Sequence, residues 1–107
     1  MTTFDKREDA FEKKFAHDAE LRFKAEARRN RLVGTWAAGL LGKRGADADA
    51  YVRSVIEADF EQPGEEDVFR KLRRDFDAAK VAVSDHQIRR TMDEMMQRAI
   101  GEIRSDS

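Results

Sequence analysis

Cysteine is absent from this 107-residue chain, and proline occurs only once, at Pro63. Without cysteine there is no disulfide and no thiolate to act as nucleophile or metal ligand. No apolar run approaches the roughly 18–20 residues that span a membrane, and the first residues are charged where a signal peptide is apolar. With so few helix breakers and no alternating strand pattern, we expect an all-helical protein without direct membrane insertion.

Charge is abundant but nearly balanced, since charged residues make up 40% of the chain and the net charge is −1. Residues 1–31 hold nine basic and seven acidic side chains, and the remainder holds twelve and fifteen. Nucleic-acid binding normally needs a dominant positive face, so this balance argues against it. The two histidines are far apart, and no nucleophile stands with a base, so we expect no metal site and no enzyme.

Apolar residues recur with helical period in four intervals joined by short connections. The first helix is expected from about residue 18 to 41, with a start near residue 4 as the alternative. The second begins after Asp47 as N-cap and stops at Pro63, and the third opens at Glu65. The fourth opens at Ser84, with Gln87 completing a capping box, and frays over residues 105–107. The short connections predict a small four-helix bundle over residues 19–107.

Specific residues are expected at the helix ends and in the core. Gly42 has the position of a C′ glycine closing the first helix. The three methionines of the fourth helix, Met92, Met95 and Met96, are interpreted as core residues rather than a binding groove. The core or near-core aromatics are predicted to be Trp36, Tyr51, Phe60, Phe69 and Phe76.

Phenylalanine forms a stripe on the charge-dense N-terminal part of the chain. Phe4, Phe11, Phe15 and Phe23 are separated by seven, four and eight residues, so they return to one side of an α-helix. Such a polar helix cannot form a core alone, and an isolated helix of this length is marginal in water. We interpret the stripe as a segment that orders on a partner, the alternative being that it folds back on the bundle.

Three stretches carry a resemblance to a known family. They are residues 14–34 (KFAHDAELRFKAEARRNRLVG), 36–42 (WAAGLLG) and 64–72 (GEEDVFRKL). Together they resemble the ζ subunit of alphaproteobacterial F-type ATP synthases, and the likeness extends over essentially the whole chain.

The resemblance implies a fold, a role and a partner. Family members look like four-helix proteins with a mobile, partly helical N-terminal inhibitory segment, which here corresponds to residues 1–18. The segment is understood to enter an interface between catalytic subunits near the central stalk, blocking rotation during ATP hydrolysis while leaving synthesis largely free. The expected partner is therefore the catalytic head of ATP synthase, and the expected location is the cytoplasm, peripheral to the inner membrane.

Within this scheme the sequence suggests roles for individual side chains. The apolar anchors are expected to be Phe4, Phe11 and Phe15. The basic contacts to acidic surfaces of the partner are expected to be Lys6, Arg7, Lys13 and Lys14. A second basic cluster, Arg28, Arg29 and Arg31, either grips an acidic loop of the partner or forms a solvated helix face paired with Glu20 and Glu26.

Two further hypotheses concern pH and nucleotides. His17 lies between the N-terminal segment and the first bundle helix, where its titration would tune the segment, or it is simply an exposed histidine. Lys43 and Arg44 follow a glycine-rich turn that lacks the spacing of a phosphate loop. No cofactor is expected, but weak ATP or ADP contact through these two residues or the arginines stays as an alternative. It would make the chain a nucleotide-sensing module, and a helical adaptor for another protein is a third hypothesis.

Overall fold

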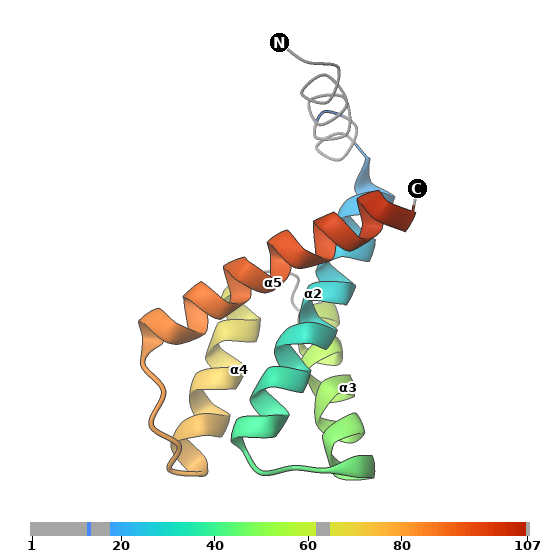
Figure 1. Ribbon diagram of the computed structural model, residues 1–107. Helices are drawn as coiled ribbons and strands as arrows, with labels where there is room; N and C mark the ends of the chain where they lie inside the picture. The colour runs from blue at the N-terminus through green and yellow to red at the C-terminus, as the bar shows by residue number, and fades with distance from the viewer. Residues whose placement is uncertain (1–12, 14–17, 62–64, 107) are drawn as a thin grey trace.

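The computed structural model describes Lys13 and residues 18–61 and 65–106 of the chain. Four helices follow one another: α2 (Ala19–Leu40), α3 (Gly45–Glu61), α4 (Glu65–Ala78) and α5 (Asp85–Asp106). No strand occurs among the described residues. The predicted all-α class and its four helices are therefore confirmed (Figure 1).

Helix α2 is the centre of the packing, because it lies against both α3 and α5, and α4 completes the assembly by contacting the same two helices. In Figure 1, α5 crosses the other helices obliquely, and its C-terminal end lies beside the first turns of α2. The core formed between the four helices is lined by Val33, Ala37, Ala38, Tyr51, Val55, Val68, Leu72, Phe76, Val83, Ile88 and Met92.

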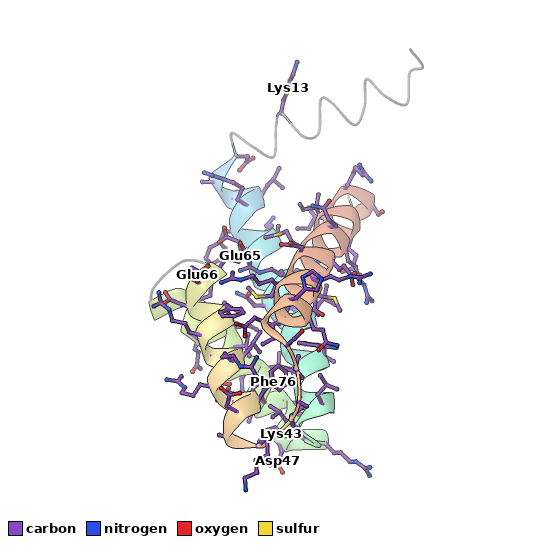
Figure 2. The ribbon with its side chains drawn as sticks, turned by 90° about the vertical axis from the view of Figure 1, so that its left-hand side faces the viewer. Lys13, Lys43, Asp47, Glu65, Glu66 and Phe76 are labelled. Carbon is purple, nitrogen blue, oxygen red and sulfur yellow. The ribbon has the colours of Figure 1, made fainter. Side chains whose placement is uncertain are left out.

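Aromatic residues fill the middle of this core. Phe76, labelled in Figure 2, is fully buried. Trp36 meets it edge to face, with ring centroids 5.6 Å apart. Tyr51 is also buried, and Phe69 packs against the core from its margin. The side chain of Phe60 lies outside the described residues. Leu40, the last residue of α2, is 44% exposed, whereas its neighbour Leu41 packs against the core.

Helix ends follow the capping chemistry of the sequence. The Ser84–Gln87 capping box is formed: the Gln87 amide donates to Ser84 Oγ at 3.1 Å and the Ser84 amide to Gln87 Oε1 at 2.9 Å. At the C-terminal end of α2, Gly42 has φ +74°, and the Lys43 amide donates to the Ala38 carbonyl at 2.9 Å. This hydrogen bond and the positive φ of Gly42 are those of a Schellman motif, so Gly42 is the C′ glycine that the sequence predicts.

Two predicted boundaries are wrong by a few residues. Helix α3 already begins at Gly45, since the Asp47 amide donates to the Arg44 carbonyl at 3.1 Å, which puts Asp47 in the first turn rather than at the N-cap. Helix α5 continues to Asp106 instead of fraying after residue 104. Its last turn is supported by the Ser105 hydroxyl, which donates to the Gly101 carbonyl at 3.0 Å.

Helices α2 and α3 meet most closely at Gly34. This residue is buried, and a Cβ added to it would lie 3.1 Å from the Cα of Val52 on α3. The obstructing atom belongs to the backbone, so no side-chain rotation could relieve the contact. Gly34 therefore sets the distance between the two helices.

We predict that Gly34→Ala lowers the free energy of unfolding by about 1–3 kcal/mol, because α3 must move away from α2 to admit the methyl group. The matched control is Gly39→Ala in the same helix, where an added Cβ would meet no atom within 4 Å. It should be neutral or stabilise by up to ~1 kcal/mol, since alanine favours helix. Urea unfolding of the two variants measures both values, and equal changes would contradict the proposed contact.

Candidate functional site

Most of the predicted contacts in the N-terminal segment cannot be placed. Lys13 is helical and exposed. The others lie outside the described residues: Phe4, Lys6, Arg7, Phe11, Lys14, Phe15 and His17. Their roles therefore stay predictions.

The first packed helix has its own N-terminal cap at Asp18. The backbone of Asp18 is extended, with φ −104° and ψ 104°, and its carboxylate accepts from the amides of Glu20 and Leu21 at 3.0 and 3.2 Å. A cap of this kind satisfies amides that an uninterrupted helix would bond to the preceding turn. Helix α2 thus begins at Asp18 without needing hydrogen bonds from the residues before it.

The structure separates Arg29 from the other two arginines of its cluster. Arg29 is only 4% exposed, and its Nε donates to Asn30 Oδ1 at 3.1 Å. Asn30 in turn donates through Nδ2 to Asp59 Oδ2 at 3.0 Å, and Arg29 Nη2 lies 3.9 Å from the same oxygen. Both readings of the sequence are corrected here, because Arg29 joins α2 to α3 through Asp59 instead of facing a partner or pairing with Glu20 and Glu26.

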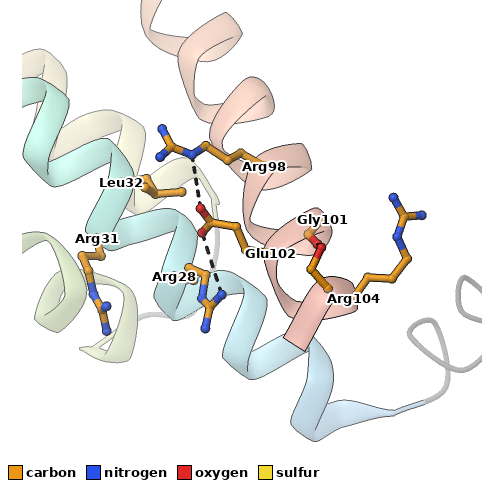
Figure 3. Close-up of a pocket in the computed structure, with 8 residues that line it drawn as sticks. Arg28, Arg31, Leu32, Arg98, Gly101, Glu102 and Arg104 are labelled. Carbon is orange, nitrogen blue, oxygen red and sulfur yellow. Dashed lines mark hydrogen bonds and ion pairs between the residues drawn. The ribbon is translucent and has the colours of Figure 1, made fainter. Parts of the chain in front are cut away.

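Arg28 and Arg31 do lie at the surface, on one wall of a cleft between α2 and α5. The cleft has a volume of about 710 Å³. Glu102 of α5 links its two walls, lying 3.8 Å from Arg28 Nη1 and accepting from Arg98 Nε at 3.3 Å (Figure 3). The lining residues are Arg28, Arg31, Leu32, Arg98, Gly101, Glu102, Arg104 and Ser105. Four arginines thus line the cleft, and two of them, Arg28 and Arg98, contact the Glu102 carboxylate.

A second cleft, of about 480 Å³, adjoins the first and is more apolar. The two share Arg28 and Arg31. Its apolar lining comes from Leu21, Phe23, Ala27 and Ile103. Phe23, the last member of the phenylalanine stripe, lies within α2 and is 52% exposed. An exposed aromatic beside arginines is typical of protein interfaces.

Lys43 and Arg44 are far from these clefts, at the opposite end of α2 (Figure 2 labels Lys43). Lys43 lines a cleft of about 430 Å³ and lies 5.8 Å from the ring centroid of Tyr51, whereas the exposed Arg44 is not part of that lining. Lys71 lies 5.0 Å from the same ring and 2.9 Å from Asp75. Lys43 therefore cannot share one nucleotide site with the arginines.

The hydroxyl of Tyr51 closes this third cleft by donating to Asp75 Oδ2 at 2.8 Å. Burial of the ring, then the hydrogen bond to Asp75 and the charge of that carboxylate, raises the pKa of Tyr51 above its ordinary value of 10.0. The neutral phenol is thus part of the folded structure.

Among residues 18–61 and 65–106, no group of three or more histidine or carboxylate side chains is placed to hold a metal ion. None of the described helices has the length and apolarity needed to cross a bilayer.

The fold and its clefts define a small, all-helical protein that presents basic and apolar surface at one end. A search among curated proteins gives no significant match. A solved structure described as a solution NMR structure is 40% identical over 81% of this chain and 99% of its own length, with a TM-score of 0.69. The family model for ATPase inhibitor subunit zeta matches residues 1–102, and the chain belongs to this family.

Membership confirms the family that the sequence resembles and gives a coarse function. The chain is an ATPase inhibitor subunit, which implies interaction with ATP synthase and a regulatory role. The family name does not specify how the chain inhibits or which of its surfaces bind the enzyme.

Sequence reasoning missed the contributions of α5 and α3 to these sites. Arg98 and Arg104 carry no local signal, because only the fold brings them beside Arg28 and Arg31. The interior position of Asn30 had a visible signal: Asn30 precedes Val33 and Ala37 by three and seven residues, so it shares their buried helix face.

Loss of the Asp59 carboxylate should destabilise the fold strongly, because it leaves the Arg29 guanidinium buried without its acidic partner. We expect Asp59→Ala to lower the free energy of unfolding by roughly 3 kcal/mol. The control is Glu57→Ala on an exposed position of α3, which should change it by less than about 0.5 kcal/mol. Urea unfolding distinguishes these outcomes, and a small loss for Asp59→Ala would contradict the interior role of the ion pair.

Alkaline pH should lower the free energy of unfolding of the wild-type protein, because Tyr51 must ionise. Above about pH 10 the unfolded chain loses the phenolic proton and the folded chain keeps it, so stability is full below that pH and falls as pH rises, by up to ~1.4 kcal/mol per pH unit. In the Tyr51→Phe variant the free energy of unfolding should fall less steeply as pH rises. Because Tyr51 is the only tyrosine, tyrosinate absorbance reports its ionisation directly. Titration near pH 10 in the folded protein would contradict this expectation.

Proposed function

We propose that the chain inhibits ATP hydrolysis by inserting its N-terminal segment, residues 1–18, at a catalytic interface of the ATP synthase head near the rotor stalk. The inserted segment obstructs rotation sterically. Residues 19–107 form the body that carries the segment to the enzyme. In this scheme Phe11 and Phe15 are the principal apolar anchors, supported by Phe4.

The cap at Asp18 is the observation that carries this proposal. Helix α2 begins there with its amides satisfied, and the described core draws on residues from Ala25 to Ile103. The family match nevertheless extends back to residue 1. A stretch that belongs to the family but precedes the capped helix is well suited to a role outside the body, which supports its assignment as the inhibitory segment.

The phenylalanine stripe supplies the driving force for insertion. Burying one phenylalanine side chain contributes about 1.5–3 kcal/mol, whereas ordering the backbone costs roughly 1–2 kcal/mol per residue before hydrogen bonds form. Several aromatic anchors are therefore needed for one segment of this length to bind. The basic residues Lys6, Arg7, Lys13 and Lys14 would add orientation by meeting acidic surface on the partner.

We predict that Phe11→Ala combined with Phe15→Ala raises the half-inhibitory concentration roughly 100-fold or more, because two buried anchors are lost. The assay is ATP hydrolysis by a purified catalytic head from an alphaproteobacterial ATP synthase. A chain lacking residues 1–18 should not inhibit. Circular dichroism and thermal unfolding should show that the double variant keeps its folded body.

The control is Asp9→Ala, which falls on the opposite side of the segment in helical period and should inhibit like the wild type. Unchanged inhibition by the phenylalanine double variant would refute the anchor assignment. Full inhibition by the truncated chain would refute the inserted segment itself. A wild-type chain that neither binds nor inhibits the head would favour an adaptor for another protein.

A further inference from the structure

The two adjoining clefts between α2 and α5 form one continuous surface. The basic cleft and the apolar cleft share Arg28 and Arg31 on α2, and both reach α5, the first at Arg98 and the second at Ile103. We call this the α2–α5 surface. It comprises Leu21, Phe23, Lys24, Ala27, Arg28, Arg31, Leu32, Arg98, Gly101, Glu102, Ile103, Arg104 and Ser105.

Basic side chains outnumber acidic ones on this surface. Five cations line it, from Lys24 to Arg104, whereas Glu102 is the one carboxylate among the lining residues and Glu20, just outside the lining, pairs with Lys24 at 3.4 Å. The Glu102 carboxylate is already engaged with Arg28 and Arg98. In a chain whose net charge is −1, such a local excess marks a place that attracts an acidic partner.

Apolar side chains lie within the same surface. Phe23 is 52% exposed, and Leu21, Leu32 and Ile103 line the clefts beside it. Burial of an exposed aromatic surrounded by arginines is the usual energetic centre of a protein interface. A free phosphate compound would use the arginines and leave these apolar side chains unburied, so the composition favours a protein ligand.

The position of the surface relates it to the inhibitory segment. Leu21 and Phe23 lie in the first turns of α2, directly after the Asp18 cap where the segment joins the body. Figure 1 shows the C-terminal end of α5 beside these turns. Any partner that takes up residues 1–18 is therefore held within reach of the α2–α5 surface.

We propose that the α2–α5 surface docks an acidic amphipathic helix of the ATP synthase head. An apolar residue of that helix packs on Phe23, and its carboxylates meet Arg31, Arg98 and Arg104. A helix fits because its apolar face can lie against Phe23 while carboxylates at the edges of that face reach the arginines. This inference rests on the proposed function, since it takes the same enzyme as partner, but it assigns a second contact that anchors the body.

The test compares full-length variants for binding to the purified catalytic head. Arg31→Glu combined with Arg104→Glu reverses two exposed charges and should weaken binding at least tenfold. Phe23→Ser should weaken it by a similar factor. Both variants should still reach full inhibition at saturating concentration, because residues 1–18 are unchanged.

The matched control is Arg53→Glu combined with Arg74→Glu, which makes the same charge change at exposed positions of α3 and α4. It should bind like the wild type. Salt provides a second readout: wild-type affinity should fall as ionic strength rises, and the Arg31/Arg104 double variant should depend on salt less. A photo-crosslinker at position 31 should capture an acidic helical peptide of the head, and one at position 74 should not.

Failure of this inference and failure of the proposed function give different results. If the wild type inhibits and the Arg31/Arg104 variant binds as well as its control, the docking surface is refuted and the inhibitory segment stands. If the Arg31/Arg104 variant loses binding to phosphatidylglycerol vesicles but still binds the head, the surface recognises a membrane and the inference is wrong. If the wild type does not inhibit, the proposed function fails and this partner fails with it.

Discussion

The close contact between α2 and α3 is the constraint on which the rest of the structure depends. At Gly34 the two helices approach until an added Cβ would lie 3.1 Å from the Val52 backbone. One turn earlier, Arg29 and Asn30 reach across to Asp59. A small residue sets the distance and a buried polar group fixes the alignment, because charged partners in an interior must meet with good geometry. Since α2 also packs on α5, the same contact positions the surface where arginines gather.

The sequence was a good guide to elements governed by local chemistry. The Ser84–Gln87 box, the Gly42 C′ position and the buried Met92 are all found where capping and periodicity predict them. These features depend on residues three or four positions apart, so a single helix contains the information. The first turn of α3 was misplaced because the Arg44 carbonyl already accepts from the amides of Asp47 and Ala48, so the helix opens before Asp47.

Features that depend on tertiary contact were not predictable in the same way. Three neighbouring arginines look alike in the sequence, yet Arg29 is buried against Asp59 while Arg31 is exposed. Arg29 lies four residues before Val33 on the buried face of α2, but only the tertiary structure brings Asp59 of α3 to it. The basic cleft likewise needs α5 to bring Arg98 beside Arg28 across more than sixty residues of sequence. The N-terminal contacts stay predictions because they concern a partner surface.

Inhibition and anchoring make different physical demands, and the proposed function assigns them to two parts of the chain, residues 1–18 and the α2–α5 surface. A segment that enters an enzyme must leave its own body at little cost, whereas a docking surface gains affinity from being preformed. The α2–α5 surface is held in place by Glu102 and by the packing of Ile103, and thus needs little reorganisation on binding. Two modest contacts joined in one molecule reach high affinity together, because the first raises the effective concentration of the second.

The Asp18 cap has a consequence for the history of such a protein. Since α2 starts from its own side-chain hydrogen bonds, its first turn does not draw on the residues before Asp18 for capping. Under the proposed function, substitutions before residue 18 therefore strengthen or abolish inhibition while the capped start of α2 is kept. A chain of this design can change its activity without changing the start of its packed body.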